Sequence, residues 1–309
     1  MRDKTGLLLI NLGSPDEPTI PAVRRYLNEF LMDPYVVDIP WLARCVLVKG
    51  IILRTRPKNS AHAYQQVWTK DGSPLVTNSI ALKNTIATQH PDMIVELGMR
   101  YGKPSIASAL DNLMQQHIEH LIVLPLFPQY SQAATESAIQ AFKKAFKKYK
   151  TQPTVNIITD FHDDPGFINA YAAIINNHLS QHPNDFLLMS YHGLPVRQDK
   201  GYSTQCYDTS ALIAQQLQLD PNRYTVSFQS RLGKTPWITP YTDEILMILR
   251  DKGITDLAVV CPSFVADCLE TLEEIGIRAK EQWLALGGHR FTLIPCLNEH
   301  GIPLPMKID

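Results

Sequence analysis

Eight short apolar segments, each bounded by turn residues, constrain the fold of this 309-residue chain more than any other feature. They do not alternate apolar with polar residues, so they predict strands covered on both faces, as in a parallel sheet. The segments are 7–12, 93–98, 121–127, 154–159, 186–191, 224–229, 256–261 and 291–296. Helical patterns separate most of them, and strand–helix–strand repetition is typical of an α/β fold wound right-handedly.

The length and the strand count together predict two domains, since a domain has roughly 150 residues. The polar stretch 147–153 offers a boundary, so we predict a first domain over 1–150 and a second over 151–309. The interval 19–90 contains no clear strand apart from 35–39, and it predicts an all-helical excursion from the first domain. Each domain is expected to be a parallel sheet flanked by helices.

Composition excludes several classes of protein. Twenty-nine basic and thirty acidic residues leave a net charge of −1, so no global field attracts nucleic acid or an anionic bilayer. No window approaches the roughly 20 apolar residues of a membrane span, and the apolar run 7–12 is shorter than the core of a signal peptide. Five scattered cysteines without a C-x-x-C pair suit a reducing compartment. We therefore expect a cytoplasmic protein.

Polar, aromatic and imidazole side chains gather where the predicted strands end. In open parallel sheets a ligand lies outside the carboxyl ends of the strands. These ends are 12–15, 99–101, 128–131, 160–162, 191–193, 229–231 and 263–264. The pattern predicts one site that faces two sheets.

Motifs for nucleotide binding and serine hydrolysis are incomplete. Gly233-Lys234-Thr235 resembles the end of a P-loop, but Phe228 stands where that loop needs its first glycine. Pro15 removes a backbone N–H where a phosphate site after the first strand would need one. Ser190 lacks the flanking glycines of a nucleophile elbow. Both functions are therefore weakly supported.

His192 is the leading reactive candidate. It ends an apolar strand, and Gly193 and Pro195 force an immediate turn that would hold the imidazole at the rim of the sheet. A histidine there can bind a divalent cation or move a proton near neutral pH; the alternative is a structural histidine. His162 precedes an Asp-Asp-Pro sequence, which favours a helix cap over a ligand.

A row of acidic residues opens the helix predicted over 268–286. Glu270 and Glu274 are four residues apart and share one face, with Asp267 near it. A helix dipole favours acids in the first turn, which explains Asp267 and Glu270 but not Glu274. Burial would raise the pKa values of such a row, which could then accept protons or pass a hard cation. Histidine with carboxylates is a plausible ligand set for ferrous or zinc ions.

Seven motifs, in order along nearly the whole chain, resemble those of ferrochelatase, the ATP-independent enzyme that inserts ferrous iron into a porphyrin in the last step of haem synthesis. They occupy 8–15, 99–102, 127–131, 190–195, 228–233, 236–237 and 262–274. The resemblance implies two Rossmann-like, chelatase-type domains with the active-site cleft between them. It also implies a lyase that inserts Fe²⁺ into protoporphyrin IX and releases two protons.

The resemblance assigns roles residue by residue. His192 matches the family's invariant histidine, described as a metal ligand, a proton acceptor, or both, and Glu270 matches the glutamate paired with it at the metal. Asp267 and Glu274 match carboxylates of an acidic proton path. Positions that hold or flank the macrocycle and its propionates are matched by Arg100, Tyr101, Tyr64, Ser73, Ser131, Trp237 and Phe264.

The segment 41–56 corresponds to the family's mobile lip. Its apolar residues either dip into a membrane surface to receive the porphyrin or line the pocket. The expected partners are protoporphyrin IX and ferrous iron, with no nucleic acid, and peripheral contact with the inner face of the membrane through 41–56 stays open. No resident cofactor is required because Fe²⁺ is a substrate, and no iron–sulfur cluster is expected because its C-terminal cysteines are missing.

The sequence departs from the family pattern in places. Cys268 stands where many relatives have a second histidine, Leu12 cannot ligate metal, and 133–136 differs from the usual threonine-rich version. The proline-containing segment 301–305 cannot form the family's closing helix. Two alternatives stay open, namely a cobalt chelatase of the same fold and a non-catalytic porphyrin- or metal-binding protein. The choice between protoporphyrin and coproporphyrin is also open.

Overall fold

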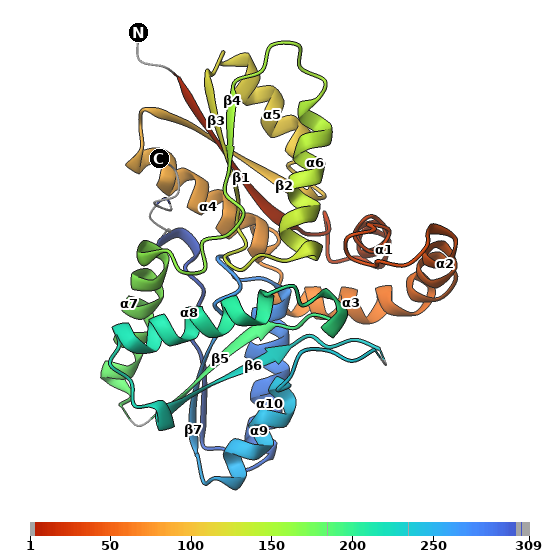
Figure 1. Ribbon diagram of the computed structural model, residues 1–309. Helices are drawn as coiled ribbons and strands as arrows, with labels where there is room; N and C mark the ends of the chain where they lie inside the picture. The colour runs from red at the N-terminus through yellow and green to blue at the C-terminus, as the bar shows by residue number, and fades with distance from the viewer. Residues whose placement is uncertain (1–3, 184, 234, 301–303, 305–309) are drawn as a thin grey trace. The chain divides into compact units, whose positions relative to one another are not determined.

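The computed structural model describes residues 4–183, 185–233, 235–300 and 304, which form two α/β units (Figure 1). The first unit extends to Asp160 and the second begins at Phe161. The division therefore falls later than the predicted boundary between 150 and 151. The reason is β4 (Thr154–Ile157), which pairs with β3 (His120–Pro125) and completes the first sheet.

The first sheet is entirely parallel and has the strand order β2-β1-β3-β4. Its central strand β1 (Thr5–Gly13) lies between β2 (Met93–Tyr101) and β3, and Leu7 to Ile10 have no exposed surface. Helices α5 (Ile106–Gln115) and α6 (Ser137–Phe146) pack apolar side chains against β1 and β3. The prediction of strands covered on both faces is confirmed for β1 and β3, whereas the edge strand β4 has no buried residue.

A helical insertion separates β1 from β2, as predicted. Residues 35–39 form turns rather than a strand. The chain enters the insertion at Thr19, whose side chain accepts a hydrogen bond from Ala22 N and caps the first helix. The insertion consists of α1 (Ile20–Leu31), α2 (Trp41–Cys45), the π-helix η1 (Val46–Ile52), α3 (Leu53–Val67) and α4 (Pro74–Gln89).

The second sheet is also parallel, with the strand order β6-β5-β7-β8. The predicted α/β class with two parallel sheets is therefore confirmed. Its strands are β5 (Phe186–His192), β6 (Tyr224–Gln229), β7 (Asp256–Val260) and β8 (Arg290–Leu293). Its helices are α7 (Pro165–Gln181), α8 (Tyr202–Gln216), α9 (Thr242–Asp251), the π-helix η5 (Glu270–Ala279) and α10 (Lys280–Ala285).

Two local predictions in the second unit have definite outcomes. The Asp-Pro sequence before α7 does cap a helix, because the Asp164 carboxylate accepts hydrogen bonds from Gly166 N and Phe167 N at 2.9 and 3.1 Å. The helix predicted over 268–286 is instead the π-helix η5 followed by α10. Trp283, fully buried, fixes α10 to the sheet by donating from Nε1 to Arg290 O at 2.9 Å.

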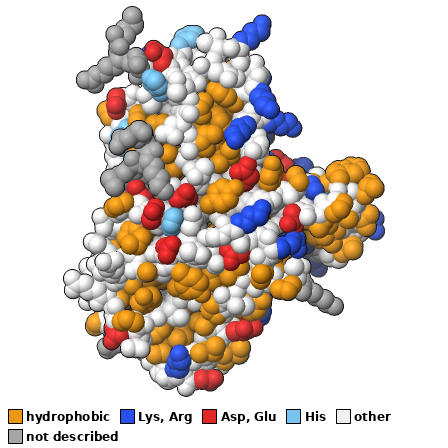
Figure 2. Space-filling model, viewed as in Figure 1, with side chains coloured by type: hydrophobic (Ala, Val, Ile, Leu, Met, Phe, Trp, Pro, Cys, Tyr) orange, Lys and Arg blue, Asp and Glu red, His pale blue; other side chains and the backbone are white. Residues whose placement is uncertain are grey.

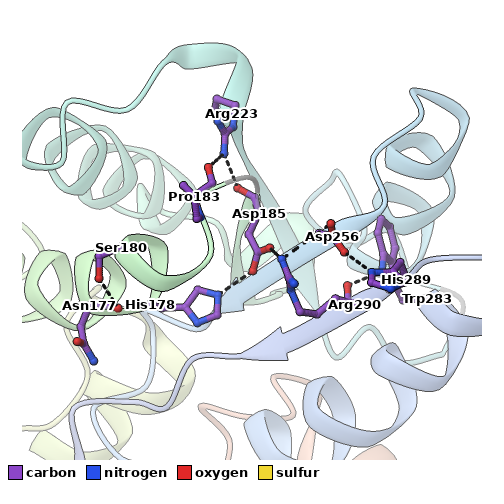
Figure 3. A network of polar contacts seen from close by, with 10 residues as sticks. All are labelled: Asn177, His178, Ser180, Pro183, Asp185, Arg223, Asp256, Trp283, His289 and Arg290. Carbon is purple, nitrogen blue, oxygen red and sulfur yellow. Dashed lines mark hydrogen bonds and ion pairs between the residues drawn. The ribbon is translucent and has the colours of Figure 1, made fainter.

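A polar network occupies the amino ends of β5, β7 and β8 (Figure 3). Asp185, whose side chain is completely buried, pairs with Arg290 and accepts a hydrogen bond from His178 Nε2 at 2.8 Å. Burial raises the pKa of Asp185, but Arg290 and His178 outweigh that effect and hold the pKa below its usual value. The network joins α7 to the sheet at the end opposite His192.

Two further predictions concern membrane-spanning helices and the C-terminal segment. Within the described residues, no helix combines the length and the apolar character that crossing a bilayer requires. The prediction that 301–305 form no closing helix falls mostly outside the described residues, because 301–303 and 305 are not among them.

Candidate functional site

His192 is the last residue of β5 and lies half-buried at the carboxyl end of the sheet. Its backbone N–H donates to Ser263 Oγ at 3.0 Å, and its Nδ1 lies 2.7 Å from Gly193 O. Because a carbonyl oxygen only accepts, we assign the hydrogen of the neutral ring to Nδ1. The lone pair of Nε2, which has no hydrogen-bond partner among the described residues, is then available to a proton or a metal ion.

The predicted turn after His192 is present and tightly packed. Gly193 N donates to Gln229 O at 2.8 Å, and a Cβ at Gly193 would lie 2.7 Å from that oxygen and 3.4 Å from the Trp237 ring. Pro195 pairs with Trp237 through an antiparallel bridge. A side chain at position 193 would displace the turn, and the imidazole with it.

Glu270 and Glu274 lie on the π-helix η5, which is hydrogen-bonded to the carboxyl end of β6. Gln229 Nε2 donates to Glu270 O at 2.8 Å, while Ser230 donates to the two carboxylate oxygens of Glu274 from its N–H at 2.8 Å and its Oγ at 2.5 Å. Ser230 adopts a φ of 68°, uncommon for a residue other than glycine. π-Helical segments of this kind are frequent at functional sites.

The electrostatics of Glu274 differ from those of an ordinary surface acid. Burial raises its pKa, against the hydrogen bonds from Ser230 and the attraction of His192 and Arg278. The carboxylate therefore lies within electrostatic reach of His192 and binds a proton more readily than a solvated glutamate. This arrangement can accept protons close to the free Nε2.

Asp267, predicted from the same acidic row, has a different environment. Its Oδ1 accepts from Thr271 Oγ1 at 2.9 Å, and its Oδ2 accepts from Asn298 Nδ2 at 2.7 Å and from Cys296 N at 3.3 Å. The residue is 5% exposed. The structure therefore separates Asp267, which is buried and accepts hydrogen bonds from three residues, from Glu274, which is partly exposed and, within the part of the chain that the structure describes, accepts from Ser230 alone.

Two apolar candidates lie near His192. The Phe264 ring centroid is 6.2 Å from that of the imidazole, and the Trp237 ring packs against Gly193. Trp237 Nε1 donates to Leu232 O at 2.8 Å, which orients the indole. The carboxyl end of the second sheet thus combines an imidazole, a carboxylate of raised pKa and two aromatic faces.

In the first unit, Arg100 and Tyr101 end strand β2 and share a buried acidic partner. Arg100 Nε donates to Ser137 Oγ at 2.7 Å, and its Nη2 pairs with Asp33. Tyr101 OH and Ser137 Oγ donate to the same Asp33 oxygen at 2.8 and 2.6 Å. Arg100 Nη1 has no partner among the described residues, so it can still receive an anion.

The protonation of this cluster is well defined. Burial raises the pKa of Asp33, but the hydrogen bonds from Ser137, Tyr35 N and Tyr101, with the charge of Arg100, bring it below its usual value. Burial also raises the pKa of Tyr101. Asp33 is therefore an anion and Tyr101 a neutral phenol at neutral pH.

The remaining predicted residues have structural contacts. Ser131 Oγ accepts from Ala134 N at 3.2 Å and caps the π-helix η2 (Gln132–Glu136). Ser73 is buried at the start of α4, and Tyr64 is buried on α3 with its ring centroid 6.0 Å from that of Trp68. Their roles toward a macrocycle stay predictions.

Sequence reasoning missed four residues of these clusters: Asp33, Ser137, Ser230 and Asn298. Ser230 lies in a strand end that the sequence already pointed to, but nothing local shows that it binds Glu274. Asp33 lies in the helical insertion, where the strand-end argument gives no signal. Each becomes visible only through a partner distant in the chain.

Comparison with known proteins gives three findings. The family model described as "Ferrochelatase" matches residues 4–302. A ferrochelatase of Legionella pneumophila (strain Paris) is 49% identical over 319 residues, covering 96% of this chain and 95% of that protein. A ferrochelatase of Coxiella burnetii (strain CbuG_Q212) is 47% identical over 325 residues, covering 96% and 90%.

Solved structures with the same fold are far more distant in sequence. SirB from Bacillus subtilis with Fe³⁺ has a TM-score of 0.57 and 13% identity, covering 96% of this chain and 90% of that one. The sirohydrochlorin chelatase SirB from Bacillus subtilis subspecies spizizenii, in complex with cobalt, has a TM-score of 0.55 and 12% identity, covering 94% and 88%. At such identity the likeness shows a chelatase-type fold and nothing more.

Proposed function

The chain belongs to the ferrochelatase family, and from this membership we infer that it inserts ferrous iron into protoporphyrin IX in haem synthesis. It is a lyase that exchanges Fe²⁺ for two porphyrin protons. The alternatives are not favoured, because relatives at 47–49% identity that this chain covers nearly end to end are named ferrochelatase. The cobalt-bound SirB, at 12% identity, supports the fold alone.

The observation that carries the mechanism is the free Nε2 of His192 beside a carboxylate of raised pKa. Insertion requires two pyrrole N–H protons to leave as the dication enters. Nε2 accepts a proton, and Gly193 O and the nearby Glu274 carboxylate stabilise the resulting imidazolium. Glu274 then takes the proton onward, which restores Nε2 for the second one.

We assign iron delivery to His192 and Glu270. One lone pair on Nε2 cannot hold iron and a proton at once, so these two roles of His192 follow each other in time. Imidazole and carboxylate are ligands that suit ferrous iron. No resident cofactor takes part, and no iron–sulfur cluster is needed.

Each unit offers groups that can hold the macrocycle. Trp237 and Phe264 offer apolar faces, and Arg100 Nη1 can pair with a propionate carboxylate. Tyr101, Tyr64, Ser73 and Ser131 belong to the carboxyl end of the first sheet or to its helical insertion. Contacts that strengthen as the porphyrin distorts toward the geometry of metal insertion would accelerate the reaction.

A peripheral membrane contact through 41–56 is part of the proposal. Trp41, Leu42, Val46 and Ile51 are exposed, and Figure 2 shows hydrophobic side chains gathered over the α2 end of the insertion. Every charged residue between Asp38 and Asp71 is Lys or Arg. An exposed apolar face with basic neighbours binds anionic lipid surfaces even when the whole chain is near neutrality. The proposed location is the inner face of the membrane.

The function is tested by mixing the purified protein anaerobically with Fe²⁺ and protoporphyrin IX and following the visible spectrum. Haem formation that requires both His192 and Glu270, probed with His192→Ala and Glu270→Gln, supports the assignment. Coproporphyrin, and Co²⁺ with other tetrapyrroles, form the comparison panel. Porphyrin binding without insertion of any metal would contradict the proposed function.

The lip proposal has a separate test. Sedimentation with vesicles that contain anionic phospholipid should deplete the wild-type protein from solution, and Leu42→Asp with Val46→Asp should reverse that. Equal sedimentation of both proteins would contradict membrane contact through 41–56.

A further inference from the structure

Residues 265–268 form an irregular, buried part of the connection between β7 and η5. Buried backbone polar groups outside helices and sheets need other partners. Asn298, thirty residues later, supplies two of them. Its N–H donates to Val265 O at 2.9 Å, and its Oδ1 accepts from Asp267 N at 2.8 Å.

Asp267 returns the contact, so the two residues form a reciprocal pair. Asn298 Nδ2 donates to Asp267 Oδ2 at 2.7 Å, which closes a ring between one side-chain amide and the backbone and side chain of Asp267. Asn298 has a φ of 48°. Asparagine is among the residues that tolerate this left-handed conformation best, so position 298 suits the residue that the pairing requires.

The pair is connected to the π-helix through Thr271. The fully buried Thr271 donates from Oγ1 to Asp267 Oδ1 at 2.9 Å and accepts from Cys268 N at 3.0 Å. Thr271 directly follows Glu270, and Glu274 comes one helical turn later. Fixing Thr271 therefore fixes where both glutamates project.

A proton carrier needs a carboxylate oxygen open to the next donor or acceptor. Asp267 meets that requirement less well than Glu274. It accepts hydrogen bonds from three residues, Thr271, Cys296 and Asn298, and is 5% exposed. Among the described residues, Glu274 is bonded by Ser230 alone, and it is partly exposed. We propose that Asp267 and Asn298 are positioning residues, whose reciprocal hydrogen bonds fix the start of η5, rather than members of a proton path. The proposal rests on the proposed function of Glu270 and Glu274.

An exchange of the two side chains tests this directly. In Asp267→Asn the amide meets the amide of Asn298, and in Asn298→Asp two carboxylates face each other. Each single variant should lower kcat by about 10-fold or more, with little change in KM for Fe²⁺. In the double variant, position 267 can donate from its N–H and its new amide to the new carboxylate at position 298, while the amide oxygen accepts from Thr271. The 3.3 Å contact from Cys296 N loses its acceptor in both Asp267→Asn and the double variant. Turnover should then return to within about 3-fold of wild type.

The exchange removes the carboxylate from position 267, so it separates the two roles. A double variant as slow as Asp267→Asn, with unchanged melting temperature, would overturn the proposal and return Asp267 to the proton path. The matched control is the same exchange at Asp220 and Asn222, an exposed pair that also shares hydrogen bonds. That exchange should leave turnover unchanged.

Amide hydrogen exchange gives a readout that does not depend on turnover. Residues 269–275 should exchange faster in each single variant and regain protection in the double variant. If the wild-type protein inserts no metal but protection follows this pattern, the proposed function fails and the positioning role stands. If the protein is active and protection does not change, the positioning role is overturned.

Discussion

The two ends of the second sheet each contain a carboxylate shielded from solvent, completely for Asp185 and partly for Glu274, and the partners of the two groups differ. At the amino end, Asp185 faces the cation Arg290 and the imidazole of His178, and its pKa is held below the usual value (Figure 3). At the carboxyl end, Glu274 is bonded by the neutral Ser230, and burial raises its pKa. The first carboxylate is compensated by charge, whereas the second keeps the capacity to bind a proton.

The difference shows that one end of the sheet stabilises the fold while the other end carries the groups proposed to react. Strand β5 runs from the residue after Asp185 to His192, so Asp185 and His192 lie at opposite ends of one strand. An ion pair on a fully buried carboxylate stabilises the fold, because loss of the cation would leave the buried carboxylate without a counter-charge. A carboxylate that is shielded from solvent but bonded by a neutral hydroxyl and N–H destabilises the fold slightly when it is ionised, and is suited to proton transfer.

The largest expected effect is the loss of iron insertion on removal of His192 at the carboxyl end, compared with removal of His178 at the amino end. His192→Ala should reduce iron insertion by about 1,000-fold or more, because it removes the proton acceptor, while porphyrin binding is largely kept. His178→Ala should leave turnover within about 2-fold, since it removes one partner of Asp185 far from the site. Anaerobic insertion assays and porphyrin fluorescence titrations measure both quantities. Similar losses in the two variants would erase the distinction between the ends.

Asp185→Asn should act on stability instead. The substitution removes the buried carboxylate that Arg290 contacts and leaves it the more distant Asp256 at 3.8 Å, so the free energy of unfolding should fall. Urea unfolding followed by circular dichroism measures that loss. Turnover of the folded variant at low temperature should match that of the wild type. A stable but inactive variant would show that the amino end contributes to chemistry after all.

Glu274→Gln should give the reverse pattern. Turnover should fall by about 100-fold, because the carboxylate that receives protons from His192 is lost. Stability should change by less than about 1 kcal/mol or increase, since the amide oxygen can accept from Ser230 N, the amide N–H can donate to Ser230 Oγ, and the charge is gone. Parallel measurement of kcat and urea midpoint tests both parts. A destabilised variant with normal turnover would place Glu274 among the structural carboxylates.

Much of this comparison could be predicted from the sequence, but its decisive part could not. The apolar segments predict the strands, and the rule that ligands lie at the carboxyl ends of parallel strands singles out His192. Asp267 and Glu274 give the same local signal, an acid near the start of a helix. Their environments diverge because Asn298 engages one and Ser230 the other, and no short-range pattern encodes these pairings.

The domain boundary illustrates the same limit. The polar stretch 147–153 resembles a linker, but the strand that follows it pairs with β3 of the first sheet. Asp33 is a further case, because its role depends on Arg100 and Ser137, which are 67 and 104 residues away. Local patterns predict elements, whereas the pairing of elements and buried polar groups is set by the folded chain.

The smallest expected effect is a difference in how pH changes the stability of Asp185→Asn and of Glu274→Gln, measured without metal. The pKa of Asp185 is lowered on folding, so its contribution is fully present above the unfolded value near 4 and is lost as pH falls through the folded value. The pKa of Glu274 is raised, so its penalty is absent in acid and develops as pH rises from about 4.3 through the folded value. Both variants should therefore approach wild-type stability in acid. Toward pH 7 the urea midpoint of Asp185→Asn should fall below wild type, while that of Glu274→Gln should equal or exceed it. If the urea midpoints of both variants shifted in the same direction relative to wild type, folding would shift the pKa values of both carboxylates in the same direction. The contrast between the ends of the sheet would then depend on His192 alone.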